Sequence, residues 1–168
     1  MNLSFSLKND RHLLCLSFAF SLLSLGGAYF VQLLGYQPCS LCVYQRIPYA
    51  IIITLSGLGI ALKNRQAATN FILSCIIIIF ICEVGLAAYH VLIEHHIIEE
   101  TSSCNASLNL SDDPNEAVKQ LMAKPTISCA NPEVIIIGLS MAEWNLFFSS
   151  LISAIIIYSR MSNATTGR

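Results

Sequence analysis

The sequence contains very little charge. Only 11% of its 168 residues are Asp, Glu, Lys or Arg, whereas 55% are hydrophobic and the mean hydropathy is +0.65. A soluble domain carries about 25% charged residues, so the shortage excludes an ordinary solvated surface and indicates a protein embedded in lipid. A net charge of −1 also excludes a polybasic surface, and no nucleic-acid partner is expected. The length is that of one domain, residues 1–168.

Charged residues are absent or nearly absent from four long stretches. The first, Leu13 to Leu34, has 22 residues and no charge. It is long enough to cross a hydrocarbon core of about 30 Å and too long for the core of a signal peptide, about 7–15 residues. The others lie at about 43–62, 71–91 and 144–158. Because their apolar residues are continuous rather than alternating, we predict an all-α membrane protein, a bundle of four transmembrane helices.

Positive charges are distributed unevenly between the connections. Six of the nine Lys and Arg residues lie in the two tails and the link at 63–69, whereas Arg46, Lys119 and Lys124 lie on the other side. Basic residues favour the cytoplasmic side, so both termini are predicted to be cytoplasmic. The connections at about 35–42 and 92–143 are then extracytoplasmic, where disulfides persist. An acidic start and an apolar pattern predict a short surface helix at about 114–123 in the longer connection.

The seven cysteines fall into two groups. Three of them lie inside the apolar stretches: Cys15, Cys75 and Cys82. A thiol in such a place usually behaves as a small hydrophobic group. The other four form two pairs in the extracytoplasmic connections, Cys39 with Cys42 and Cys104 with Cys129.

Each pair alone has a simpler interpretation. Cys-x-x-Cys occurs in metal sites as well as in redox loops, and Cys104 and Cys129 could form a structural disulfide that only closes the loop. A structural disulfide, however, does not need a second dithiol on the same side of the membrane. The two pairs together favour thiol–disulfide exchange, in which a thiolate attacks a disulfide and forms a mixed disulfide.

Arg46 is the most informative single residue near the first pair. Burying an arginine in a membrane helix costs about 2.5–3.5 kcal/mol, and here it also opposes the charge bias. Cys42 is expected at the N-terminal end of the second helix, where the helix dipole favours an anion such as a thiolate. Arg46, one turn further on, shares a face with Cys42. We interpret Arg46 as a cation beside a thiolate and an anionic or quinonoid acceptor; the alternative is a side chain that only reaches lipid headgroups.

Several motifs of this chain occur together in one known family. The first runs from Pro38 to Tyr49 and reads PCSLCVYQRIPY. The others are Tyr89-His90 followed by Glu94, Cys104 and Cys129 near the ends of the long connection, and Gly138-Leu139-Ser140-Met141-Ala142 before Asn145. With four membrane spans, this set resembles the DsbB family of bacterial disulfide-forming membrane proteins over nearly the whole chain.

The resemblance implies a protein-dithiol:quinone oxidoreductase of the bacterial inner membrane, with its active site on the periplasmic face. It implies that a reduced, DsbA-like thioredoxin-fold partner attacks the Cys104–Cys129 disulfide at Cys104. Cys129 would then attack Cys39, and the thiolate of Cys42 would reduce a ubiquinone or menaquinone near Arg46. A DsbA-like partner is itself a strong oxidant, at about −120 mV, so its reoxidation needs an acceptor such as a membrane quinone. No metal is expected.

Two further ionisable residues are of interest. His95, beside Glu94, lies where the resemblance places polar residues near the quinone, and it is a candidate for cofactor binding. An interfacial histidine without a ligand is the alternative. Glu83 lies deep in the third span and matches no motif of the family. A carboxyl group inside the membrane is a functional candidate, or else a neutral, hydrogen-bonded group.

Three other functions remain open from the residues themselves. The first is a metal-binding or metal-transport protein that uses the four cysteines with His95 or His96, because thiolate and imidazole suit Zn or Cu(I). The second is a non-enzymatic four-helix membrane subunit whose long connection is closed by a disulfide. The third is a reductase, with the same chemistry and the opposite direction of electron flow.

Overall fold

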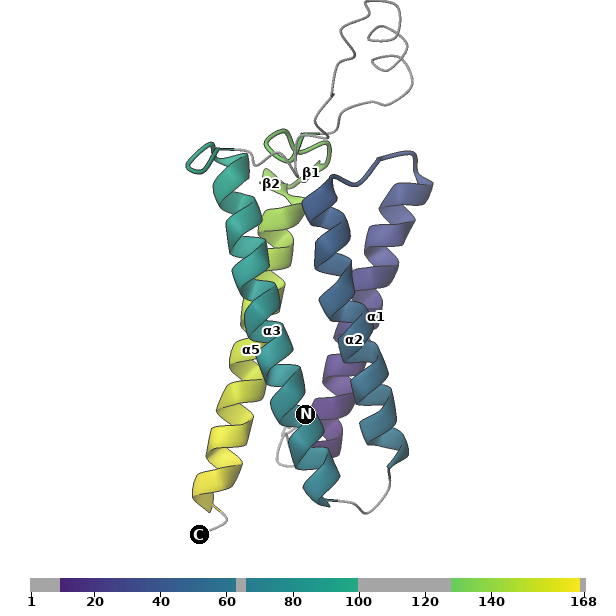
Figure 1. Ribbon diagram of the computed structural model, residues 1–168, viewed down its shortest axis with the longest axis vertical. Coiled ribbons are helices and arrows are strands. Elements are labelled where there is room, and N and C mark those ends of the chain that lie inside the picture. The colour runs from purple at the N-terminus through teal and green to yellow at the C-terminus, as the bar shows by residue number, and fades with distance from the viewer. Residues whose placement is uncertain (1–9, 63–65, 100–127, 167–168) are drawn as a thin grey trace, which may run out of the picture.

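The computed structural model describes residues 10–62, 66–99 and 128–166 (Figure 1). In this part of the chain four helices run along the long axis of the molecule: α1 (Asp10–Leu33), α2 (Ser40–Ala61), α3 (Gln66–Glu94) and α5 (Met141–Thr166). Each is long and apolar enough to cross a membrane. The predicted four-helix transmembrane bundle is confirmed. Cys104 and the surface helix predicted at about 114–123 lie outside the described residues.

The bundle buries one apolar core and turns many other apolar side chains outward. The core takes side chains from all four helices: Leu13, Leu14, Tyr49, Ile52, Ile72, Leu73, Ile76, Phe80 and Ile156. On the outside, Leu33 is 85% exposed and Phe71 is 71% exposed. Soluble monomers rarely expose large contiguous apolar patches, so this exterior is suited to contact with lipid.

The start of α1 and the end of α5 lie at the same end of the bundle. Arg160 donates to Asp10, with 2.9 Å between Nη1 and Oδ1. Because the chain runs along the bundle four times, its first helix begins and its last helix ends on the same side, as the sequence predicts. That this side is cytoplasmic stays a prediction.

The helices begin before the positions where the hydropathy changes, and α2 and α5 begin at capping residues. α2 begins at Ser40 rather than at 43, α3 covers 66–94 rather than 71–91, and α5 begins at Met141 rather than at 144. At α5, Ser140 Oγ accepts from the backbone N–H of Glu143 at 3.1 Å, and the backbone N–H of Ser140 donates to Glu143 Oε2 at 2.7 Å. This reciprocal capping box extends the helix through polar residues, which the apolar stretch in the sequence does not include. Parts of both predicted connections are therefore helical.

A β-hairpin precedes α5, in a segment that is too short to cross the membrane. β1 (Ile135–Ile136) pairs antiparallel with β2 (Leu139–Ser140). Between them Ile137 and Gly138 have φ angles of 55° and 82°, as a two-residue type I′ turn requires. Ile137, at the tip, is 89% exposed. Trp144 in α5 contacts the hairpin, because its Nε1 donates to the backbone carbonyl of Ile136 in β1 at 2.9 Å.

Three helices approach one another closely at Gly59 in α2. A Cβ atom there would lie 2.9 Å from a methyl carbon of Leu14 and 3.4 Å from one of Ile72, whereas a Cβ at Gly57 would meet nothing nearer than 3.7 Å. We expect Gly59→Ala to be less stable than the matched control Gly57→Ala by about 1–3 kcal/mol, the cost of overpacking, because the gain in helix propensity is common to both. Unfolding in detergent followed by circular dichroism measures the difference, and equal stabilities would contradict this account.

Candidate functional site

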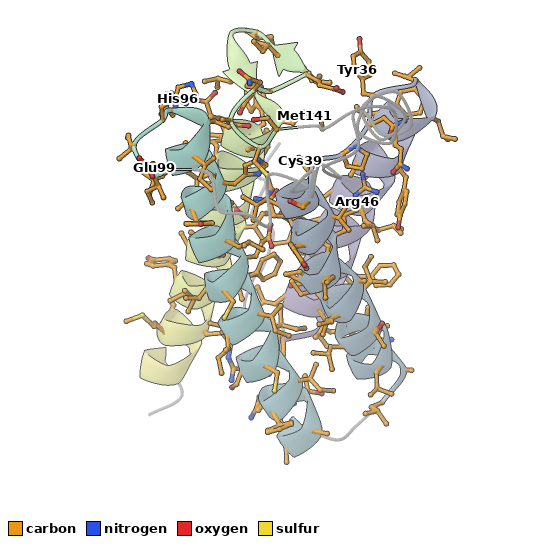
Figure 2. All side chains as sticks on the ribbon, turned by 45° about the horizontal axis from the view of Figure 1, so that its top comes forward. Tyr36, Cys39, Arg46, His96, Glu99 and Met141 are labelled. Atoms are coloured by element: carbon orange, nitrogen blue, oxygen red, sulfur yellow. The ribbon has the colours of Figure 1, made fainter. Side chains whose placement is uncertain are left out.

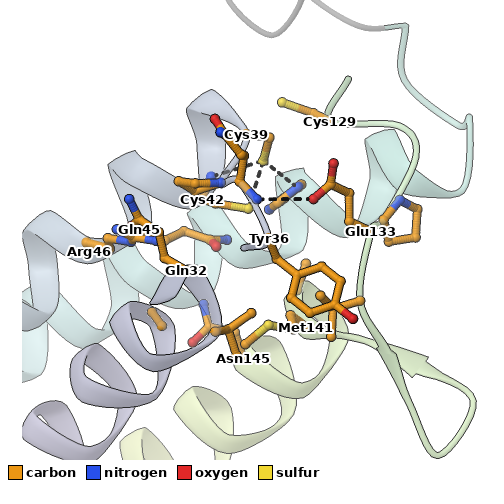
Figure 3. Close-up of a pocket in the computed structure, with 18 of the residues that line it drawn as sticks. Gln32, Tyr36, Cys39, Cys42, Gln45, Arg46, Cys129, Glu133, Met141 and Asn145 are labelled. Carbon is orange, nitrogen blue, oxygen red and sulfur yellow. Dashed lines mark hydrogen bonds between the residues drawn. The ribbon is translucent and has the colours of Figure 1, made fainter. Parts of the chain in front are cut away.

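The two connections and four helix ends meet at the end of the bundle away from the termini. Figure 2 shows Cys39, Arg46 and Met141 at this end. The backbone N–H of Gln37, in the first connection, donates to Oε2 of Glu133, in the second, at 3.2 Å. These segments surround a cavity of about 160 Å³, lined by side chains from all four helices and both connections (Figure 3).

Cys39 and Cys42 lie at the N-terminal end of α2, as the sequence predicts. Cys39 is the N-cap residue, and its Sγ accepts from the backbone N–H of Cys42 at 3.3 Å. The two sulfur atoms are 2.8 Å apart. Since a disulfide holds its sulfurs about 2.05 Å apart, bond formation needs little movement. Both residues line the cavity.

Cys129 comes from the second connection and lies against the first pair. Its side chain is 1% exposed, and its Sγ is 3.6 Å from Oγ of Ser40. The sulfurs of Cys39 and Cys129 and a ring nitrogen of His90 all lie within 4.8 Å of one another. The structure thus brings together three of the four cysteines proposed from the sequence, and the fourth, Cys104, lies outside the described residues.

The surroundings of Cys39 keep its thiol protonated. The hydrogen bond with Cys129 lowers the pKa of Cys39, but the hydrogen bond with Cys42 and burial of the side chain together raise it more. The net result is a pKa raised from 9.0 to about 12. In the dithiol form Cys39 therefore needs a neighbouring group that takes its proton before it can act as a nucleophile.

His90 is an imidazole beside Cys39, and the sequence indicated it only as part of a motif. Its Nε2 is 3.6 Å from Cys39 Sγ and 3.8 Å from Glu94 Oε1. The other carboxyl oxygen of Glu94 accepts from Ser140 Oγ at 2.5 Å. A line of polar groups thus leads from the start of α5 to the thiol. The spacing of His90 and Glu94 by one helical turn is the signal that could have placed them on one face.

Arg46 also lines the cavity, one turn beyond Cys42. Its Nη1 donates to Gln32 Oε1 at 2.7 Å, and its guanidinium carbon lies 4.7 Å from the ring centre of Tyr29, a cation–π contact. Arg46 Nε and Gln45 Nε2 are buried donors without a hydrogen-bond partner in the described part of the chain. A buried donor without a partner lowers the stability of the fold by about 1–3 kcal/mol. Acceptor atoms of a bound ligand would remove this cost, so the two groups indicate where a ligand binds. Sequence reasoning missed Gln45.

The structure does not bring His95 to the cavity. Its side chain is 57% exposed, and its Nε2 lies 2.9 Å from Oε1 of Glu143. α3 ends at Glu94, and Glu94 rather than His95 lines the cavity. A contact between His95 and a cofactor therefore stays a prediction from the sequence.

The same cluster would also suit a metal ion. Cys39, His90 and Cys129 offer two thiols and an imidazole within 4.8 Å of one another, and this set of ligands is typical of Zn or Cu(I) sites. The geometry alone therefore supports either thiol exchange or metal binding.

Comparisons with known proteins separate these alternatives. The family model described as disulfide bond formation protein DsbB matches residues 10–159. The chain is 30% identical over 144 residues to disulfide bond formation protein B 1 of Pseudomonas fluorescens, covering 83% of each chain. It is 32% identical over 129 residues to disulfide bond formation protein B of Xanthomonas axonopodis pv. citri, covering 73% of each. An uncharacterized protein of Rickettsia prowazekii is 29% identical over 148 residues, covering 85% of this chain and 84% of its own.

Proposed function

The chain belongs to the DsbB family of disulfide bond formation proteins, and on this basis we propose that it is a protein-dithiol:quinone oxidoreductase. It reoxidises a DsbA-like thioredoxin-fold protein and passes the electrons to a membrane quinone. We place it in the bacterial inner membrane, with the cavity on the periplasmic face. The observation that carries the proposal is that Cys129, from the second connection, lies beside the Cys39–Cys42 pair of the first.

The relay begins at the second pair. A thiolate of the reduced partner attacks Sγ of Cys104, the Cys104–Cys129 bond breaks, and Cys129 leaves as a thiolate. Cys129 then attacks Sγ of Cys39, so that a Cys39–Cys129 bond forms and the Cys39–Cys42 bond breaks. Cys42 is released as a thiolate at the N-terminal end of α2, where the helix dipole stabilises it.

The relay then restores the second pair. The partner's other thiolate attacks its mixed disulfide with Cys104, and the partner leaves in its disulfide form. Cys104 attacks Cys129 of the Cys39–Cys129 bond, which re-forms Cys104–Cys129 and releases Cys39. The two electrons of the partner's dithiol now reside on Cys39 and Cys42. His90, 3.6 Å from Cys39, is placed to accept the proton when the Cys39–Cys42 disulfide forms again.

The residues of the cavity fit a quinone head. Such a group has a flat, largely apolar ring and carbonyl oxygens that accept hydrogen bonds. The cavity offers apolar walls from Leu25, Ala28 and Val31 and the buried donors of Gln45 and Arg46. When bound, ubiquinone or menaquinone supplies the acceptor for two electrons and two protons. Arg46 holds a positive charge one turn from Cys42.

A coupled assay tests the function. The purified full-length protein in detergent is mixed with ubiquinone-1 and a reduced protein of the DsbA class. We expect one quinone to be reduced for each disulfide formed in the partner, measured by quinone absorbance and by titration of the partner's thiols. Quinone reduction without oxidation of the partner, or no quinone reduction at all, would contradict the proposal.

Removing the charge beside Cys42 is expected to weaken quinone binding. In Arg46→Ala the KM for ubiquinone-1 should rise about 10–100-fold, because a hydrogen bond to a charged group contributes about 1.5–3 kcal/mol. The KM for the reduced partner should stay as in the wild type. Arg46→Lys is the matched control and should be intermediate, since it keeps the charge and loses the planar fork. An unchanged KM for quinone in Arg46→Ala would show that Arg46 does not contribute to quinone binding.

Metal analysis tests whether Cys39, His90 and Cys129 instead form a metal site. A metal protein should carry about one Zn or Cu ion per chain when its thiols are reduced and lose it on oxidation. The oxidoreductase should instead turn over at full rate in the presence of a chelator. Stoichiometric metal together with no quinone reduction would favour the metal-binding function.

A further inference from the structure

A buried carboxyl group deeper in the bundle has no part in the thiol relay. Glu83 in α3 is fully buried. It lies seven residues before His90, and hence about 10 Å further into the bundle on the same face of the helix. Its Oε1 accepts from Nδ2 of Asn145 in α5 at 2.8 Å, and its Oε2 has no hydrogen-bond partner among the described residues. An ionisable side chain in a membrane helix costs about 2.5–3.5 kcal/mol, so a gain elsewhere must offset its presence.

Asn145 and Tyr49 connect this carboxyl group to the cavity. The hydroxyl of Tyr49 in α2 donates to Oδ1 of Asn145. Asn145 and Tyr49 both line the cavity, whereas Glu83 does not. Figure 3 shows Asn145 around the same cavity as Gln45 and Arg46. The three residues of the network come from three different helices.

These contacts fix the direction of the Asn145 amide. Oε1 of Glu83 is an acceptor, so it requires the Nδ2 side of the amide, and the hydroxyl of Tyr49 donates to the Oδ1 side. Turning the amide over would set two acceptors against each other at Glu83, whereas the hydroxyl of Tyr49 can accept as well as donate, so Glu83 decides the orientation. Nδ2 carries two hydrogens. One goes to Glu83, and no described residue accepts the other.

We propose that Asn145 donates this second hydrogen to a ring carbonyl oxygen of the quinone, and that Glu83 and Tyr49 are positioning residues that fix the amide's direction. The inference rests on the proposed function, because it takes a quinone as the ligand of the cavity. It adds a donor on α5 to those of Gln45 and Arg46 on α2. It also explains why a carboxyl group is buried at position 83. Without Oε1 of Glu83 as an acceptor for Nδ2, the amide of Asn145 is no longer held in one orientation.

The test separates binding of quinone from binding of the thiol partner. In Asn145→Leu we expect the KM for ubiquinone-1 to rise about 3–10-fold, the effect of one neutral hydrogen bond. The kcat and the KM for the reduced partner should stay unchanged. Ser153→Ala is the matched control, because Ser153 is buried in the same helix and donates only to the backbone carbonyl of Ser149 at 2.7 Å. This control should behave as the wild type.

Two variants of Glu83 test the positioning role. Glu83→Gln keeps an acceptor oxygen for Asn145 and should retain a KM for ubiquinone-1 near that of the wild type. Glu83→Leu removes the acceptor and should raise this KM about as much as Asn145→Leu does. Equal effects of the two Glu83 variants would show that the carboxyl group does not act through Asn145. This pair tests the same claim if Asn145→Leu does not fold.

A binding measurement without thiol chemistry distinguishes the inference from the proposed function. The chain has one tryptophan, Trp144, next to Asn145, so quenching of its fluorescence by ubiquinone-1 reports binding. The dissociation constant should rise in Asn145→Leu by the same factor as the KM. If the wild type reduces ubiquinone-1 and Asn145→Leu binds it equally well, the inference is wrong and the function stands. If the wild type neither binds nor reduces ubiquinone-1, both are wrong.

Discussion

Replacing Cys42 with serine is expected to stop quinone reduction, with a loss of roughly 10⁴-fold or more, as when a covalent catalytic group is removed. Without Cys42, the sulfur of Cys39 still lies within 4.8 Å of Cys129. The thiolate of Cys39 then attacks the Cys104–Cys129 disulfide at Cys129. A Cys39–Cys129 bond forms, Cys104 leaves as a thiolate, and the oxidation state of the protein does not change. Mass spectrometry of non-reduced peptides should recover the Cys39–Cys129 disulfide.

Cys82→Ser is the matched control for this result. Cys82 is exposed on the outside of α3 and does not line the cavity. Its replacement should leave both turnover and the disulfide pattern as in the wild type. Full turnover in Cys42→Ser would refute the relay. Recovery of only the Cys104–Cys129 disulfide in that variant would show that the two pairs do not exchange.

The second large effect is expected at His90. Re-forming the Cys39–Cys42 disulfide requires that Cys39, with a pKa of about 12, lose its proton. In His90→Phe the rate of reoxidation should fall about 10²-fold, at the lower end of what a general base contributes. The remaining rate should rise about tenfold for each pH unit, because below its pKa the thiolate fraction of Cys39 rises by that factor. Stopped-flow reoxidation of the reduced protein by ubiquinone-1 at several pH values measures both effects.

His95→Phe is the matched histidine control. His95 lies five residues along the chain and contacts Glu143 rather than a thiol. We expect its reoxidation rate and pH dependence to follow the wild type. A pH profile of His90→Phe parallel to that of the wild type would show that another group takes the proton. A loss in His95→Phe as large as in His90→Phe would support the prediction that His95 lies at the acceptor.

Hydropathy and the cysteine spacing predicted most of the architecture, because both are properties of the local sequence. Four long apolar stretches are enough to place four membrane helices, and a Cys-x-x-Cys motif before such a stretch is enough to place Cys42 at a helix start. The polar caps at Cys39 and Ser140 extend the helices beyond the apolar residues. The helix starts predicted from hydropathy were accordingly late by about one turn, and the end predicted for α5, at 158, was early because the helix runs to Thr166.

The walls of the cavity were harder to predict, because they depend on how each helix is rotated in the bundle. α3 is apolar on nearly all sides, so the sequence does not indicate that Glu83 and His90 face inward. A difference of one residue at the end of the same helix decides that Glu94, and not His95, lines the cavity. The network of Glu83, Asn145 and Tyr49 joins residues from three helices. Such a network is visible only once the helices are packed.

The hairpin before α5 connects the site to the surrounding lipid. Its three consecutive isoleucines, Ile135 to Ile137, are 63%, 44% and 89% exposed. Exposing apolar surface to water costs about 25 cal/mol per Å², so the tip is suited to contact with the apolar part of a membrane. The same hairpin ends in Ser140, which bonds Glu94. The hairpin therefore joins an exposed apolar tip, suited to contact with lipid, to a hydrogen bond on a residue that lines the cavity.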